Sequence, residues 1–158
     1  MSETYIEILL QSLNKKEQVL KEIIRLDEVQ KAQLEDEMCP VDDFDETVEA
    51  KSQCIEQLEQ LDSGFQKVYD RVSEELKENK EAHADEIRRM KELIRRLTDL
   101  SVEIQAQEAR NKDLMVKKFA DVKKKTKELR TSGKAANEYY KNMMKINNID
   151  PQFMDNKN

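Results

Sequence analysis

Residues that break helices are almost absent from this chain. Its 158 residues include two glycines and two prolines, and neither type occurs between Phe65 and Arg130. One unbroken helix over that range would be about 100 Å long, because an α-helix rises about 1.5 Å per residue. A compact α/β domain needs many tight turns, and this sequence has few residues that form them. With 39% charged residues and 5% aromatics, the composition is typical of long helices or a coiled coil.

A first helix is predicted from about Thr4 to about Glu37. Its apolar residues recur at steps of three and four, which places them on one face of a helix. Pro40 ends this helix because proline lacks the amide that would continue the hydrogen-bond ladder. Four polar residues interrupt the apolar stripe: Lys16, Glu17, Gln30 and Lys31.

A second helix is predicted from about Phe44, with Asp42 or Asp43 as its N-cap. The apolar stripe of this helix keeps its phase across Gly64. One glycine inside a helix costs only about 1 kcal/mol relative to alanine, so we favour a continuous helix there. Two polar residues interrupt this stripe: Lys51 and Asp62.

The stretch ENKEAHAD at residues 78–85 is polar on all sides of a helix. We therefore predict a bend or break within it, with Asp85 as a cap for the third helix. Without a break, the architecture would be one hairpin with a long protruding arm. The overall prediction is an all-α fold, either an elongated antiparallel helical hairpin or a three-helix coiled-coil bundle, with a C-terminal amphipathic arm.

In QAQEARN, residues 105–111, the apolar stripe becomes polar, and Glu108 and Asn111 take inward positions. We favour a hydrated core layer or a device that fixes helix register. The functional alternative is a polar contact to a partner helix, made by Glu108, Arg110 and Asn111.

Charge is unevenly distributed along the chain. Residues 1–70 hold 7 Lys and Arg against 18 Asp and Glu, whereas Arg110–Lys134 holds 10 basic and 3 acidic residues. This basic stretch can pair with the chain's own acidic half, with an acidic partner or with nucleic acid, and we rank these in that order. Nucleic acid ranks last because the stretch has a single aromatic, Phe119, rather than aromatics interleaved with the basic residues, and no nucleic-acid module is recognisable.

Nothing in the sequence predicts a membrane or an oxidising compartment. The apolar runs are too short to span a bilayer, and the N-terminal residues lack the cationic start of a signal peptide. Cys39 and Cys54 are the only cysteines, and we expect them to stay reduced in the cytoplasm.

No residue pattern predicts catalysis, a metal site or a cofactor. His83 is the only histidine, and we expect it to be an exposed surface residue, because acid–base catalysis needs a positioned partner. A di-iron bundle would need two Glu-x-x-His motifs. Gly64 and Gly133 stand alone, so neither belongs to a phosphate-binding loop. We predict that the chain is not an enzyme and acts by binding.

The C-terminal stretch AANEYYKNMMKINNIDPQFM, residues 135–154, is unusually apolar and aromatic for this chain. Met and Tyr give large, adaptable contacts of the kind used to bind helices. Two interpretations stay open: the stretch folds back and completes the core of the bundle, or it captures a helix of another protein. We divide the chain into a bundle, 1–133, and a tail, 134–158. The predicted binding residues are Tyr139, Tyr140, Met143, Met144, Ile146, Ile149, Phe153 and Met154.

Three segments together resemble FlgN-type flagellar export chaperones, particularly clostridial versions. They are YIEILLQSLNKKEQVLKEIIRL before an acidic linker, then FDETVEAKSQCIEQLEQL, and finally LIRRLTDLSVEIQAQEARNKDLM. The last helix of the family typically ends with an Arg–Asn or Asn–Arg element before leucines, which Arg110, Asn111 and Leu114 match. Many members have a longer loop, with Gly and Pro, where this chain has ENKEAHAD.

The resemblance implies a cytoplasmic, non-enzymatic chaperone of the flagellar type III export system. Such chaperones bind the C-terminal helices of hook–filament junction proteins, keep them unpolymerised and deliver them to the export apparatus. The family places capture in the C-terminal part, here Tyr139–Met154. The main alternative is a self-associating coiled-coil scaffold with the tail as its oligomer contact, so both a monomer and a homodimer are compatible with the sequence.

Overall fold

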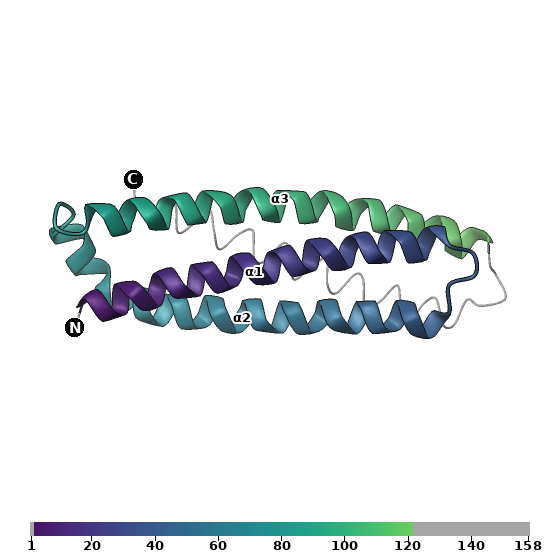
Figure 1. Ribbon diagram of the computed structural model, residues 1–158, viewed down its shortest axis with the longest axis horizontal. Helices are drawn as coiled ribbons and strands as arrows, with labels where there is room; N and C mark the ends of the chain where they lie inside the picture. Colours follow the sequence, from purple (N-terminus) through teal and green to yellow (C-terminus); the bar gives the residue numbers. More distant parts are fainter. Residues whose placement is uncertain (1, 122–158) are drawn as a thin grey trace.

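The computed structural model describes residues 2–121, which form three long helices side by side (Figure 1). These are α1, Ser2–Glu35, α2, Val41–Glu78, and α3, Ala84–Asp121. α2 runs antiparallel to α1, and α3 returns in the direction of α1. The described part of the chain contains no strand. The predicted all-α class is therefore confirmed, and the three-helix bundle replaces the single hairpin with a protruding arm.

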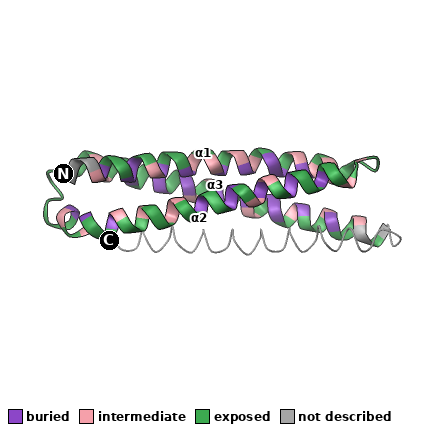
Figure 2. Cartoon of the chain, turned by 90° about the horizontal axis from the view of Figure 1, so that it is seen from below, coloured by how far each residue is buried: buried purple, intermediate pink, exposed green. Residues whose placement is uncertain are grey.

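The centre of the bundle is α1. It packs along both α2 and α3, whereas the backbones of α2 and α3 approach each other at few points. Figure 2 shows buried positions as stripes along each helix, with exposed residues between them. This follows from apolar residues at steps of three and four, which a helix of 3.6 residues per turn collects on one side.

The predicted interruptions of the helices are largely confirmed. α2 continues through Gly64, where a Cβ atom would meet nothing within 4 Å. The polar stretch at 78–85 does contain a break, since α2 ends at Glu78 and α3 begins at Ala84. Two separate helices exist here even though the connection lacks Gly and Pro.

The predicted helix caps are wrong. Pro40 is the N-cap of α2 and has no side chain that could make a capping hydrogen bond. Asp42 and Asp43 lie inside the first turn, where negative charge still interacts favourably with the helix dipole. Likewise, Asp85 lies in the first turn of α3, and its carboxylate accepts a hydrogen bond from Arg88 at 3.3 Å instead of capping the helix.

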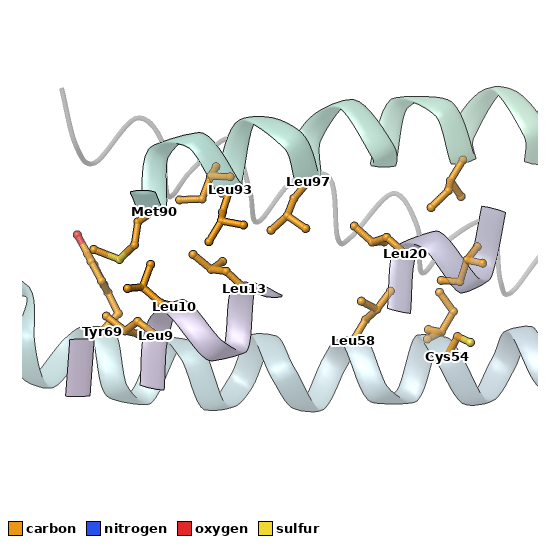
Figure 3. Packing of buried hydrophobic residues seen from close by; sticks show 14 of the residues in the cluster. Leu9, Leu10, Leu13, Leu20, Cys54, Leu58, Tyr69, Met90, Leu93 and Leu97 are labelled. Atoms are coloured by element: carbon orange, nitrogen blue, oxygen red, sulfur yellow. The ribbon is translucent and has the colours of Figure 1, made fainter. Parts of the chain in front are cut away.

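The main apolar cluster fills the bundle over most of its length, with side chains from all three helices meeting between the ribbons (Figure 3). Burying one such side chain fully contributes about 1.5–3 kcal/mol. Near one end, Phe65 stacks on Tyr69 with ring centroids 6.1 Å apart. Seven cluster members are almost completely inaccessible: Leu9, Leu20, Ile23, Leu58, Met90, Leu97 and Ile104.

A second, much smaller apolar cluster lies near the α1–α2 connection. It consists of Phe44 and Val48 from α2 and Met115 from α3, with Leu34 of α1 packed against them. The two clusters do not join. Between them, the interior of the bundle is occupied by charged and amide side chains.

Candidate functional site

The polar residues that interrupt the apolar stripes contact one another across the bundle. Lys16 of α1 reaches Asp62 of α2, with Nζ 2.9 Å from Oδ1 and both side chains largely buried. At the surface, Arg96 of α3 donates two hydrogen bonds to the carboxylate of Glu17, at 2.8 and 3.2 Å. The Lys16–Asp62 contact thus pairs an interruption of the α1 stripe with an interruption of the α2 stripe.

Lys51 is the centre of the most buried polar group. Its side chain is 2% exposed, and its Nζ lies 2.8 Å from Oδ1 of Asp27 and 2.6 Å from Oε1 of Glu108. It also donates a hydrogen bond to Oε1 of Gln30 at 2.8 Å. These contacts join α2 to both α1 and α3, so one lysine links all three helices.

Asn111 completes this group from α3. Its Nδ2 donates to the backbone carbonyl of Asp27 at 3.0 Å and to Oε1 of Gln30 at 3.1 Å. A buried amide needs hydrogen-bond partners. Because these partners lie on α1, the contacts fix the axial position of α3 along α1. We call Asp27, Gln30, Lys51, Glu108 and Asn111 the Lys51 layer.

A half-exposed rim covers one side of the Lys51 layer. Arg110 donates to Oδ1 of Asn111 at 3.2 Å and to Oε1 of Glu28 at 3.1 Å. Gln107 donates to the same Glu28 oxygen and to the backbone carbonyl of Ile24, each at 3.1 Å. The rim therefore ties α3 to α1 just outside the buried charges.

Burial raises the pKa of Glu108 to about 9, and a hydrogen bond with Asp27 adds to the rise, while the Lys51 ammonium opposes it. At neutral pH this raised pKa favours the protonated form of Glu108. This lowers the cost of placing two carboxyl groups beside a single lysine, since like charges at such distances repel strongly.

The structure brings Glu108, Arg110 and Asn111 together, and each contacts α1 or α2 of the same chain. This geometry matches the predicted core layer that fixes helix register. In the sequence, Gln30 and Lys51 were apparent only as interruptions of a stripe, and Asp27 did not stand out. The sequence signal for this group is a lysine at an inward position of α2, combined with polar residues at inward positions of both α1 and α3.

His83 is half-buried rather than exposed, which corrects the expectation. Its backbone amide donates to the carbonyl of Asn79 at 3.2 Å, and this turn places Nε2 3.8 Å from Oε1 of Glu75. Cys39 is half-buried and Cys54 is buried, and the two do not form a disulfide with each other. Across residues 2–121, no group of three or more His, Cys, Asp and Glu side chains is arranged to hold a metal ion.

An open groove lies between the first half of α1 and the start of α3. Its volume is about 410 Å³, and its apolar part is formed by Leu10 and Leu93. Its polar lining consists of Asn14, Glu92 and three arginines, Arg88, Arg89 and Arg96.

The eight predicted binding residues of the tail, from Tyr139 to Met154, lie outside the described residues, as does most of the basic stretch Arg110–Lys134. Among the described residues, four large apolar side chains are substantially exposed: Ile8 on α1, Met38 in the α1–α2 connection, and Val102 and Val116 on α3.

Comparison with known proteins gives a family match. The family model described as FlgN protein matches residues 1–145, which is well over half of the chain. No curated protein and no solved structure matches it. None of the described helices is long and apolar enough to cross a membrane.

Proposed function

The chain belongs to the FlgN family, a family of flagellar chaperones, and we propose that it is a cytoplasmic export chaperone for hook–filament junction proteins. The observation that carries the proposal is the family match over residues 1–145. On this proposal the chain binds the C-terminal helices of its substrates, keeps them unpolymerised and delivers them to the type III export apparatus. It works by binding and has no enzymatic activity.

We assign substrate capture to the tail, residues 134–158. The described bundle supports this assignment because its large apolar side chains are mostly buried in its own core. A substrate helix that later buries its apolar face in a filament needs a temporary apolar cover. The Tyr and Met residues of the tail have the adaptable chemistry for such helix-in-groove contact.

Release is as necessary as capture for an export chaperone. If binding orders the tail and the substrate helix together, part of the interaction free energy is spent on that ordering. We therefore expect moderate affinity, which allows the export apparatus to take over the substrate.

Size-exclusion chromatography with light scattering tests the assignment. Full-length protein and a truncation after Gly133 are each run alone and with C-terminal fragments of hook–filament junction proteins. The proposal predicts a defined complex for the full-length chain only. Binding by neither form would contradict the chaperone role. Binding by both would contradict the tail assignment and direct attention to the groove beside Arg89.

A coiled-coil scaffold is the second candidate, because α3 carries an exposed apolar stripe. Val102 and Val116 are 58% and 55% exposed, and Ala106 and Ala109 between them are exposed as well. The spacing of four, three and seven residues is that of a coiled-coil seam. Light scattering of the protein alone decides: a stable dimer that Val102→Glu abolishes would favour the scaffold, and a monomer would exclude it.

A further inference from the structure

The Lys51 layer separates two apolar clusters of very different size. On one side, the main cluster reaches the layer at Leu26, Cys54 and Ile104. On the other side, the described residues form the small cluster of Phe44, Val48 and Met115, with Leu34 against it. We call the part of the bundle beyond the layer the distal end; it comprises residues 31–50 and 112–121.

When the helices of a bundle separate locally, the side chains that were packed between them at that place become exposed to water. An apolar surface newly exposed to water is costly, whereas charged and amide groups are solvated by water once they are exposed. Over most of this bundle, the side chains exposed by such a separation would be apolar. At the Lys51 layer they comprise a lysine, two carboxyl groups and two amides.

The contacts described across the distal end include hydrogen bonds to backbone carbonyls. Beyond the small cluster, Gln33 donates to the backbone carbonyl of Asp43 at 3.2 Å, and Lys118 donates to the carbonyl of Asp36 at 3.4 Å. Both bonds lie at the surface, where water replaces them readily. The opposite end of the bundle differs, because there the apolar core continues through Ile6 to the last turn of α2.

We propose that the Lys51 layer divides the bundle into two cooperative units, so that the distal end opens while the main core stays folded. Segments of a protein that open separately are those with few buried apolar contacts of their own. The distal end includes the last described turns of α3, so its opening frees the part of α3 that precedes the tail. The opening needs no binding partner, so this proposal can be tested independently of the proposed function.

Hydrogen exchange measured by mass spectrometry on the full chain at pH 7 tests the proposal. Peptides from 31–50 and 112–118 are compared with peptides from 5–23, 55–76 and 90–104. We expect the distal peptides to exchange together, with protection at least ~10-fold lower than at the opposite end, where helix termini also occur. Equal protection at the two ends would overturn the proposal.

An apolar layer provides the decisive variant. Asp27→Leu, Lys51→Met and Glu108→Leu are combined, while Gln30 and Asn111 keep their mutual hydrogen bond. Joining the two clusters should raise protection of the distal peptides at least ~10-fold, because both parts then open as one unit. The matched control is Lys16→Met with Asp62→Leu, a buried pair inside the main core, which should leave distal protection unchanged. No gain in the first variant, or an equal gain in the control, would overturn the proposal.

A smaller substitution covers the case in which the apolar variant does not fold. Met115→Ala removes one member of the small cluster and leaves the layer intact. It should speed exchange at 31–50 and 112–118 without changing exchange at 90–104. Faster exchange of the whole bundle by the same factor would show a single cooperative unit and would overturn the proposal.

Discussion

The Nζ atom of Lys51 on α2 lies 2.6 Å from Oε1 of Glu108 on α3, inside the bundle and away from water. α2 and α3 approach each other at few other points along their backbones. This contact therefore does much to set how the two outer helices are aligned. Several expected outcomes depend on it.

Lys51→Ala should lower the free energy of unfolding by about 3–5 kcal/mol. The substitution leaves two buried carboxyl groups without their cation, and breaking a buried pair costs far more than the pair contributes. Urea denaturation followed by circular dichroism measures the change. Lys21→Ala is the control, because Lys21 is exposed and 3.9 Å from Glu17, and such surface pairs contribute below about 1 kcal/mol. Similar losses in both variants would contradict the buried layer.

Stability should fall as the pH rises from about 5 to about 9. The pKa of Glu108 is about 9 in the folded protein against 4.5 for an ordinary glutamate. The folded state thus keeps a proton that the unfolded state releases, and the stabilisation is complete below about pH 4.5 and lost towards pH 9. The loss is up to about 1.4 kcal/mol per pH unit.

Glu108→Gln provides the control for this pH dependence. Glutamine resembles the protonated carboxyl in shape and cannot ionise, so the variant should lack the component that Glu108 contributes. Denaturation midpoints at pH 5, 7 and 9 compare the two proteins. Parallel curves for wild type and variant would show that Glu108 is not the titrating group.

Leu97→Ala should lower the free energy of unfolding by about 2–5 kcal/mol, because it leaves a cavity in the main cluster. Val102→Ala on the same helix lies at the surface and should change it by less than about 0.5 kcal/mol. Thermal or chemical denaturation measures both. A large loss from Val102→Ala would indicate that the outer face of α3 is covered, for instance by a second copy.

Gly64→Ala should stabilise the protein by about 0.5–1 kcal/mol. Gly64 lies inside α2, and an added Cβ would meet nothing within 4 Å. Alanine lowers the entropy of the unfolded chain and favours the helix. A shift of the urea midpoint to higher concentration is expected, and a shift to lower concentration would indicate that α2 is bent at this position.

The apolar stripes predicted the three helices because helical periodicity is a local property of the sequence. The break at 79–83 was predicted for the same reason, since ENKEAHAD has no apolar face to bury. The N-cap of α2 was not predicted correctly. Pro40 starts the helix ahead of Asp42 and Asp43, the two residues whose side chains favour an N-cap position.

The Lys51 layer was only half predictable. Inward positions for Glu108 and Asn111 followed from the stripe of α3 alone. Their partners depend on how far each helix slides along its neighbours, which spacing within one helix does not determine. Asp27 was overlooked because a single aspartate near an apolar stripe carries no sign that it will meet a lysine from another helix.

Isothermal titration with the C-terminal helical fragment of a hook–filament junction protein is the sharpest test of substrate capture by the tail. The full-length chain is compared with Tyr139→Ser combined with Met143→Ser, and with a control carrying Asn137→Ser and Asn142→Ser in the same tail. We expect the fragment to bind the wild type and the control alike and to lose at least ~10-fold in affinity for the Tyr–Met variant. Equal binding to all three proteins, or to none, would contradict capture by the tail.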